Sequence, residues 1–276
     1  MTAGPSPPSI LRFDRVRVTF EGATVLDDVS FEACEGESRV IFGAAGSGKT
    51  VLLKTALGLI QPDSGRVLAF GRDLSAMRER DLFEIRSRMG MLFQEGALFD
   101  SLTIEQNVAY PLVNQKSIHC PKDQVRPRVV EALEFVELGG TLEKFPSELS
   151  GGMRRRAAIA RAVVTAPPLI LYDSPTAGLD PITAHTIIAL LIKERDLSHT
   201  TTLVVTHRYQ DGNVIANFRY NSEQGSLEPV RNGAGRHAKT VFMVLREGRL
   251  VFEGDQHRLE QSTDPYICKF VKQREA

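Results

Sequence analysis

The chain has 276 residues, 42% of them hydrophobic, and its 34 lysines and arginines balance 34 aspartates and glutamates. This length and apolar content predict a folded protein with a large core, and zero net charge argues against a nucleic-acid partner. Cys34, Cys120 and Cys268 lie far apart, which predicts reduced thiols of a cytoplasmic protein. No run approaches the roughly 18 to 20 apolar residues of a membrane span, and no secretory signal begins the chain.

The first part of the chain predicts strands that lead into a helix. Residues 1–9 are expected to be a flexible, proline-rich tail. Residues 11–20 alternate apolar and polar side chains, as a half-exposed strand does, and residues 25–31 form a second extended run. A short apolar strand at residues 38–42 then runs into a glycine-rich loop and a helix at residues 49–59.

Helices and strands alternate through the rest of the chain. Residues 95–158 are predicted to be mainly helical, with Val129, Leu133 and Val136 on one helix face. The further expected elements are strands at 169–172 and 202–206, a helix opened by Pro181 and capped by Asp180, and a hairpin of residues 241–245 and 250–252. This order predicts an α/β fold with a parallel core sheet and an added antiparallel β layer.

An eight-residue segment between the predicted strand at 38–42 and the helix after it matches the P-loop pattern G-x-x-x-x-G-K-[ST]. It consists of Gly43, Ala44, Ala45, Gly46, Ser47, Gly48, Lys49 and Thr50. Glycines let backbone N–H groups turn toward a phosphate, and the helix N-terminus adds partial positive charge. Lys49 is expected to reach the β- and γ-phosphates and the Thr50 hydroxyl to ligate Mg²⁺. The segment predicts a nucleoside triphosphate site.

A second motif precedes the strand at 169–172. Residues 149–153 (Leu149, Ser150, Gly151, Gly152 and Met153) resemble the LSGGQ signature of the ABC ATPase family. Ser150 is placed to cap the helix that follows, which leaves amide groups and a hydroxyl facing an anion. Alone the motif is a helix cap; after a P-loop and before an apolar strand, it makes the chain resemble this family over about residues 10–255.

The resemblance implies roles for further residues at matching positions. Asp173 looks like the Walker B aspartate that holds Mg²⁺, and Asp180 lies in a segment that resembles the D-loop. Gln94, which follows an expected strand at residues 89–93, is similar to the Q-loop glutamine that contacts Mg²⁺ or the attacking water, and His207 is similar to the switch histidine. Phe20 is the first candidate to stack on adenine, although Phe13 and Phe31 as core residues would give the same pattern.

In this family each ATP lies between the P-loop of one copy and the signature of a second, so the resemblance implies a dimer around Mg-ATP. The segment after Gln94, residues 95–99, is expected to contact the membrane subunit and is apolar enough to dock.

One position departs from the family pattern. The residue after the Walker B aspartate is normally the catalytic glutamate, and here it is Ser174. A serine hydroxyl is too weak a base at neutral pH, while a positioned general base is worth about 10²- to 10⁴-fold in rate. We expect ATP binding to be intact and hydrolysis to be slow, unless another carboxylate, with Asp180 nearest in sequence, or a partner ATPase supplies the missing function.

Residues 86–112 (RSRMGMLFQEGALFDSLTIEQNVAYPL) and the LSGGM form of the signature resemble the MlaF type of ATPase. That resemblance implies phospholipid movement between bacterial membranes and a place on the cytoplasmic face of the inner membrane. It implies an integral permease, a periplasmic MCE-domain protein and a small STAS-domain subunit as partners. Two other hypotheses stay open: a non-hydrolysing, ATP-dependent regulatory switch, and a soluble ABC protein of translation or DNA repair.

Two segments of the chain contain none of the motifs described above. A polar insert at residues 208–240, with strand-like pieces at 214–220 and 227–230, is expected to be a surface hairpin, or else a contact with a partner subunit. Residues 256–276 are expected to be a C-terminal tail that is helical near 266–272.

Overall fold

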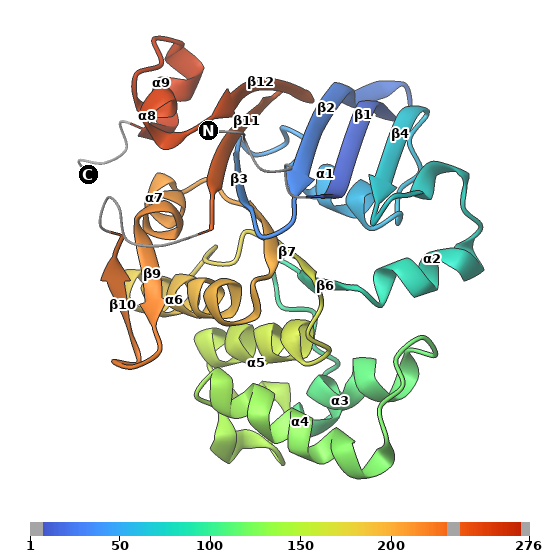
Figure 1. Ribbon diagram of the computed structural model, residues 1–276, viewed down its shortest axis with the longest axis vertical. Coiled ribbons are helices and arrows are strands. Elements are labelled where there is room, and N and C mark those ends of the chain that lie inside the picture. Colours follow the sequence, from blue (N-terminus) through green and yellow to red (C-terminus); the bar gives the residue numbers. More distant parts are fainter. Residues whose placement is uncertain (1–7, 231–237, 272–276) are drawn as a thin grey trace, which may run out of the picture.

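The structure is a computed structural model that describes residues 8–230 and 238–271. Its main sheet has six strands in the order β12-β11-β3-β8-β7-β6, and a second sheet has four in the order β2-β1-β4-β5 (Figure 1). The main sheet comprises β3 (Ser38–Phe42), β6 (Met89–Leu92), β7 (Leu169–Asp173), β8 (Thr201–Val205), β11 (Thr240–Arg246) and β12 (Arg249–Gly254). The second comprises β1 (Ser9–Phe20), β2 (Ala23–Cys34), β4 (Ser64–Ala69) and β5 (Arg72–Asp73).

The main sheet is parallel from β11 to β6, and β12 adds an antiparallel edge strand. Every residue of β3, β7 and β8 is buried, as expected of strands covered on both faces. Alternate residues enter different cores: Val204 packs toward the long helices, and Leu203 and Val205 toward the antiparallel sheet. The predicted α/β fold with a parallel core and an antiparallel layer is confirmed.

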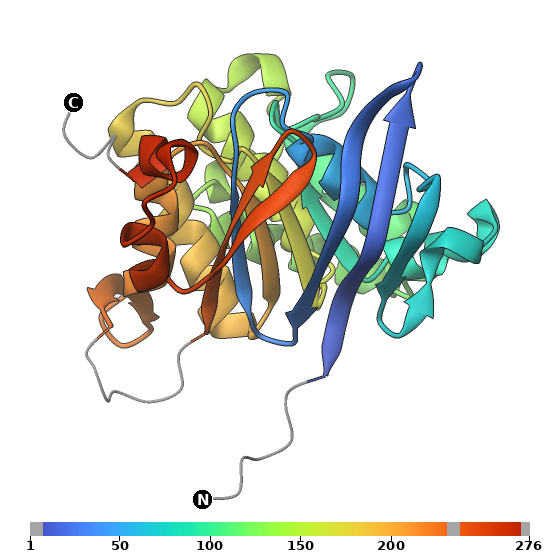
Figure 2. The ribbon, with the colours of Figure 1, turned by 90° about the horizontal axis from the view of Figure 1, so that it is seen from above.

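The antiparallel sheet lies beside the main sheet as a separate layer (Figure 2). Between them lies α1 (Lys49–Ala56) (Figure 2). The buried side chains of α1 and of α2 (Glu79–Arg86) join the same core. Phe13 and Phe31 face each other across β1 and β2 with ring centroids 4.7 Å apart, and both are buried. These two aromatic residues are therefore core residues, whereas Phe20, at the end of β1, is 45% exposed.

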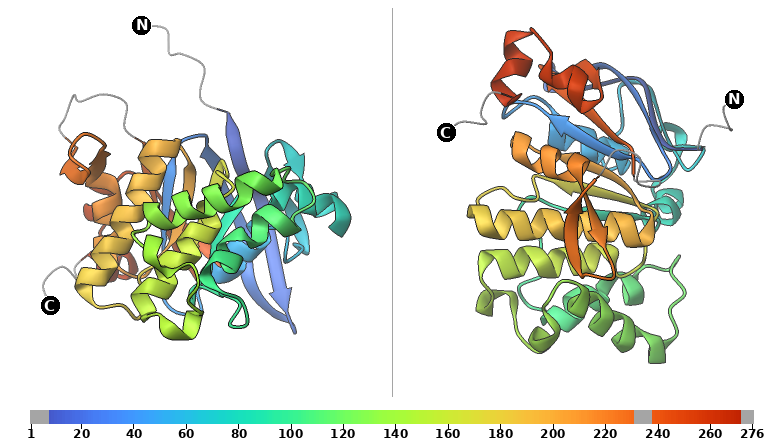
Figure 3. Two further views of the ribbon diagram at one scale, coloured as in Figure 1. Left: turned by 90° about the horizontal axis from the view of Figure 1, so that it is seen from below. Right: turned by 60° about the vertical axis from the view of Figure 1, so that its left-hand side comes forward.

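The opposite face of the main sheet carries a helical layer, which Figure 3 shows from below. It contains α3 (Ile104–Asn114), α4 (Lys122–Phe135), α5 (Gly151–Val163) and α6 (Pro181–Ser198). Two single-turn helices, η2 (Gly139–Thr141) and η3 (Pro146–Glu148), join α4 to α5, and η1 (Leu74–Ala76) precedes α2. Val129, Leu133 and Val136 are fully buried, so the predicted apolar face is confirmed. The predicted cap of α6 is present as well, because Asp180 accepts hydrogen bonds from the amides of Ile182 and Thr183.

The insert after β8 differs from the expectation. Residues 214–217, expected in a strand, belong to α7 (Tyr209–Asn217), and the hairpin is restricted to β9 (Phe218–Asn221) and β10 (Ser226–Pro229). Tyr209, Gly212 and Ile215 are buried at helical spacing, and a Cβ on Gly212 would lie 2.9 Å from the Phe42 and Phe242 rings. Close packing of this glycine on the sheet thus favours a helix over the expected strand. Residues 231–237 of the insert lie outside the described residues.

The insert is tied to α6 (Figure 3). Arg195 donates to the backbone oxygens of Ile215 and Phe218, and Asp196 accepts from the amide of Tyr220. These contacts fit a surface extension of the domain, which was the first of the two interpretations.

The C-terminal segment, expected to be a tail, forms two helices that pack against the domain. It contains α8 (Gln256–Glu260) and α9 (Pro265–Val271), and Ile267 and Phe270 are buried. Phe270 stacks against Phe42 at 6.1 Å, so α9 packs on the end of the main sheet. Leu259, Ile267 and Phe270 are buried, but the charged residues around them made this apolar pattern hard to recognise in the sequence. Of the N-terminal tail, residues 1–7 lie outside the described part, and Ser9 begins β1.

Within the described residues, no helix combines the length and the apolar character that crossing a bilayer requires.

Candidate functional site

The predicted P-loop joins the buried end of β3 to the N-terminus of α1. Gly46 and Gly48 have φ values of 76° and 102°, which favour glycine. Close packing requires Gly43, because a Cβ there would lie 2.6 Å from the Leu245 backbone oxygen. Ala44, Ala45, Gly46 and Thr50 are exposed, and Ser47 is buried. The loop thus presents its outer backbone and the Thr50 hydroxyl at the surface of the sheet edge.

Lys49 turns back over this loop. Its ammonium donates to the backbone oxygens of Gly43 and Ala44, both at 2.8 Å. Burial lowers the pKa of Lys49, and the nearby Asp173 carboxylate opposes that shift. A partly desolvated cation above a loop of amide groups is suited to bind phosphate.

Four predicted segments follow the C-terminal ends of four neighbouring strands. The P-loop follows β3, His207 follows β8, Asp173 ends β7, and Gln94 follows β6. Ile41, Val205 and Asp173 are aligned across the three central strands. Because these strands are parallel, all four segments lie at one edge of the sheet, where ligands bind in open α/β proteins.

Asp173 and Ser174 lie at the centre of this edge. The Asp173 side chain is buried, and the Ser174 hydroxyl donates to its carboxylate at 3.3 Å. The Ser174 amide bonds the Val205 backbone oxygen, and its φ is 48°, in the left-handed region. The side chain at position 174 is therefore held at a fixed place beside the aspartate.

A buried carboxylate, which the sequence analysis missed, connects the loops after β7 and β8. Asp211 accepts hydrogen bonds from the hydroxyls of Thr176 and Thr206, at 2.6 and 2.8 Å. Burial raises the pKa of Asp211, while these hydroxyls, Arg208 and His207 act to lower it. His207 itself is exposed at the start of this loop. Asp211 lies on α7, so no motif adjacent to the strand ends could have revealed it.

The predicted signature does not follow any strand of the main sheet. It begins α5, where the Ser150 hydroxyl caps the helix by accepting from the amide of Met153 at 3.2 Å. Leu149 is buried, and Ser150 and Gly151 are exposed. A Cβ on Gly152 would lie 2.6 Å from the methyl carbon of Thr183, so this glycine also allows α5 to pack against α6.

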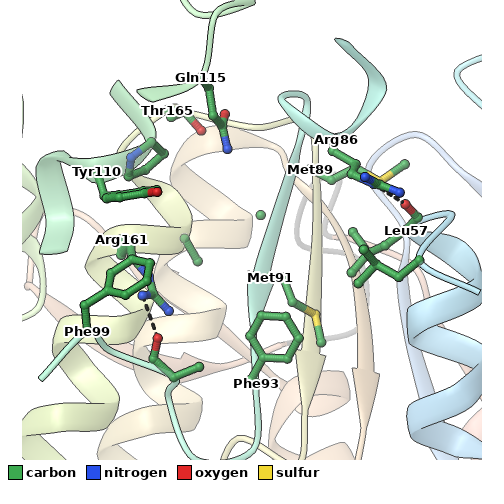
Figure 4. Close-up of a pocket in the computed structure, with 15 residues that line it drawn as sticks. Leu57, Arg86, Met89, Met91, Phe93, Phe99, Tyr110, Gln115, Arg161 and Thr165 are labelled. Atoms are coloured by element: carbon green, nitrogen blue, oxygen red, sulfur yellow. Dashed lines mark hydrogen bonds between the residues drawn. The ribbon is translucent and has the colours of Figure 1, made fainter. Parts of the chain in front are cut away.

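A groove lies along β6, the strand that precedes Gln94, between this edge strand of the main sheet and the helical layer (Figure 4). The cavity has a volume of about 320 Å³. Its lining residues are mainly apolar and include Leu57, Leu59, Met89, Met91, Phe93, Ala97, Phe99, Tyr110, Pro111, Arg86, Gln115 and Arg161. The Phe99 and Tyr110 rings lie 4.7 Å apart and are 42% and 39% exposed.

The segment 95–99 is fixed in this groove by two side chains. Arg161 donates to the backbone oxygens of Gly96 and Ala97, both at 2.8 Å. Asn107, which is fully buried, bonds both the amide and the backbone oxygen of Phe99. These hydrogen bonds therefore hold Phe99 in place on its loop, and α3 carries Tyr110.

The C-terminal helix also reaches the P-loop. The Tyr266 hydroxyl accepts from the amide of Ala44 at 2.9 Å and donates to the Leu245 backbone oxygen. This contact was not predicted, because it joins residues 222 positions apart.

Comparison with known proteins decides the family. Residues 26–177 match the family model described as ABC transporter. A curated relative, the intermembrane phospholipid transport system ATP-binding protein MlaF of Haemophilus influenzae, is 35% identical over 90% of this chain and 84% of its own length. The chain belongs to the ABC transporter family.

Other relatives agree with this placement. MlaF of Escherichia coli K12 is 34% identical over 90% of the chain and 82% of that protein. The probable ribonucleotide transport ATP-binding protein mkl of Mycobacterium leprae is 40% identical over 68% of the chain and 54% of that protein. One similar solved structure is a dimeric post-hydrolysis state of the ATP-binding cassette MJ0796, bound to ADP and Pi. It has a TM-score of 0.74 and a sequence identity of 28%, and the match covers 89% of this chain and 98% of that chain.

The chain is thus an ATP-binding subunit of ABC type, an ATPase whose hydrolysis is coupled to transport. The Lys49 ammonium and the Asp173 carboxylate are in place, and the position beside Asp173 holds a hydroxyl.

Proposed function

We propose that this chain powers or gates a transporter that moves phospholipid between bacterial membranes. Similarity to MlaF along nine-tenths of the chain supports this proposal, since the match includes most of the relative's own length. The mkl relative, named for ribonucleotide transport, suggests a second cargo, but this chain covers about half of that protein. Transfer of labelled phospholipid out of vesicles that contain the reconstituted complex, compared with uptake of a labelled ribonucleotide by the same vesicles, distinguishes the two cargoes.

The residues at the sheet edge suit Mg-ATP. Amides of residues 43–50 and the Lys49 ammonium would hold the phosphates, and the exposed ring of Phe20 would stack on adenine. The Thr50 hydroxyl, the Asp173 carboxylate and the Gln94 amide oxygen are the hard oxygen donors that Mg²⁺ prefers. Bound there, Mg²⁺ would neutralise charge that develops on the phosphates. His207 lies at the same edge and would contact the γ-phosphate.

The nucleotide site would be completed by a second ATPase copy. The exposed N-terminus of α5, with the Ser150 hydroxyl and the Gly151 amide, is suited to face an anion across a dimer interface. Two molecules of ATP would then hold the dimer closed, and hydrolysis would release it. The dimeric MJ0796 structure gives the general precedent for such pairing.

Mixing two defective variants tests whether the site is shared. Lys49→Ala removes the phosphate-binding cation, and Ser150→Asp keeps the helix cap but sets a negative charge against the partner's nucleotide. We expect each variant alone to stay monomeric with ATP, as measured by sedimentation, and an equal mixture to form dimers. One site of the mixed dimer then joins an intact P-loop to an intact signature. If the mixture stays monomeric while wild-type chain dimerises, the signature does not act in trans.

The groove along β6 would receive a helix of the integral permease. Phe99→Ala removes one ring of the exposed pair, and buried aromatic anchors at interfaces are worth about 2 kcal/mol, or about 30-fold in Kd. We expect this variant to bind ATP normally and to co-purify with its membrane subunit much less than wild type does. Phe83→Ala, which removes an aromatic ring that is 60% exposed on α2 outside the groove, is the matched control. Equal losses in both variants would contradict the assignment of the groove.

We infer further that the subunit lies peripherally on the cytoplasmic face of the inner membrane, held by its permease. A periplasmic MCE-domain protein and a STAS-domain subunit would complete the assembly. These inferences follow from the similarity to MlaF. Identification of the subunits that co-purify with the tagged chain tests them.

Hydrolysis would be slow, because Ser174 stands where the family normally has its catalytic glutamate. The same observation supports a second candidate, an ATP-dependent regulatory switch that is paired with a complete ATPase. Phosphate release measured with and without the permease separates them, since a switch releases none in either case. A soluble ABC protein would leave no membrane subunit to recover.

A further inference from the structure

Three carboxylates on the segments around Ser174 already have other partners or roles. Asp173 is buried beside the Ser174 hydroxyl. Asp180 accepts two backbone amides at the N-terminus of α6, and Asp211 accepts the hydroxyls of Thr176 and Thr206. Asp180, the nearest substitute in sequence, is thus engaged as a helix cap.

Glu95 is different from these three. It is exposed, and within residues 8–230 and 238–271 its carboxylate has no hydrogen-bond or ion-pair partner. Leu92 pairs with Tyr172 in the parallel register of β6 and β7, so the chain leaves β6 at the level at which Asp173 ends β7. Neighbouring strands lie only about 4.8 Å apart.

A tight turn keeps Glu95 close to this edge. The amide of Gly96 donates to the Phe93 backbone oxygen at 2.8 Å, which makes residues 93–96 a turn with Glu95 at its third position. Gly96 has a φ of 80°, so the chain reverses directly after Gln94. The carboxylate is therefore carried by the same turn as the predicted Q-loop glutamine.

Arg155 joins that turn to the loop after Ser174. Its guanidinium donates to the Phe93 oxygen from one nitrogen and to the Ala177 oxygen from another, both at 3.2 Å, and the residue is 8% exposed. Burial lowers the pKa of Arg155, and the Glu95 and Asp173 carboxylates oppose this. One buried cation thus interacts with both carboxylates, Glu95 on the turn after β6 and Asp173 at the end of β7.

We propose that Glu95 is the carboxylate that orients the attacking water in place of the missing residue at position 174. This rests on the proposed ATPase site and concerns the turnover that remains there. The water oxygen bonds the γ-phosphorus while the bond to the β–γ bridging oxygen breaks. The electron pair of the broken bond stays on ADP, and the water's proton leaves with phosphate and solvent. Phosphoryl transfer depends mainly on how the attacking water is positioned. Without Glu95 the site would have no acceptor for the hydrogen bond that positions this water.

The experiment compares the full-length chain, in complex with its membrane subunit, as wild type, Glu95→Gln, Ser174→Glu and the double variant. We expect Glu95→Gln to lower kcat about tenfold or more, since positioned catalytic groups are worth at least that, with ATP affinity unchanged. After incubation with ATP it should retain ATP as a closed dimer, where wild type retains ADP. In the double variant, the new glutamate should restore turnover. Asp100→Asn removes an exposed charge from the same loop and serves as the control.

If Glu95→Gln turns over ATP at the wild-type rate and retains ADP, the assignment of Glu95 is wrong. The assignment is also wrong if Asp100→Asn lowers kcat as much as Glu95→Gln does. Either result leaves the proposed function intact if Ser174→Glu still accelerates hydrolysis. Failure of wild-type chain to bind ATP at all would instead overturn the proposed function. A double variant that stays inactive while Ser174→Glu alone is active would mean that Glu95 acts on the fold of the loop.

Discussion

Lys49→Ala is expected to weaken ATP binding by about 10²-fold, because it removes a charge-assisted contact to two phosphates worth about 3 kcal/mol. In the described structure the ammonium bonds the Gly43 and Ala44 backbone oxygens and is partly desolvated. The Ala44 carbonyl is exposed, so water can replace the lost donor there, whereas the Gly43 carbonyl belongs to a buried residue. The substitution therefore acts on the ligand more than on the fold.

Equilibrium binding of a fluorescent ATP analogue measures this effect. Lys54→Ala provides the matched control, since Lys54 lies in the last turn of the same helix, away from the loop. Unfolding by urea should give similar midpoints for both variants. Unchanged affinity in Lys49→Ala would contradict the assignment of residues 43–50 as the phosphate site.

The P-loop could be predicted because its chemistry is local. Eight consecutive residues specify the turn, the cation and the helix start, and no distant contact is needed to recognise them. The grouping of Gln94, Asp173 and His207 was also accessible, since each follows a predicted parallel strand and such strands end at one edge.

The supporting contacts could not be predicted in the same way. Arg155 is one of three consecutive arginines in the signature helix, and only its packed orientation singles it out. Asp211 and Tyr266 act across 35 and 222 positions of sequence, on helices whose placement depends on the packing of Gly212, Ile267 and Phe270. Such contacts depend on tertiary packing, which overrides local propensity.

Ser174→Glu has the largest expected effect on catalysis, a gain of about 10²- to 10⁴-fold in kcat, the range of a positioned general base. The backbone at this position is already in the left-handed region with a side chain present, so the substitution adds no new backbone strain. The Ser174 amide remains bonded to the Val205 oxygen, which fixes the direction in which a longer side chain extends. ATP affinity should change little, because Lys49, Thr50 and Asp173 are untouched.

Ser174→Gln is the decisive control for that gain, since it has nearly the same shape and no basic carboxylate. Steady-state phosphate release from the assembled transporter should rise for the glutamate variant and stay at or below wild type for the glutamine variant. Equal gains would mean that side-chain length, and not basicity, limits the wild-type site. No gain in either variant would mean that the hydroxyl at position 174 is not the limiting defect.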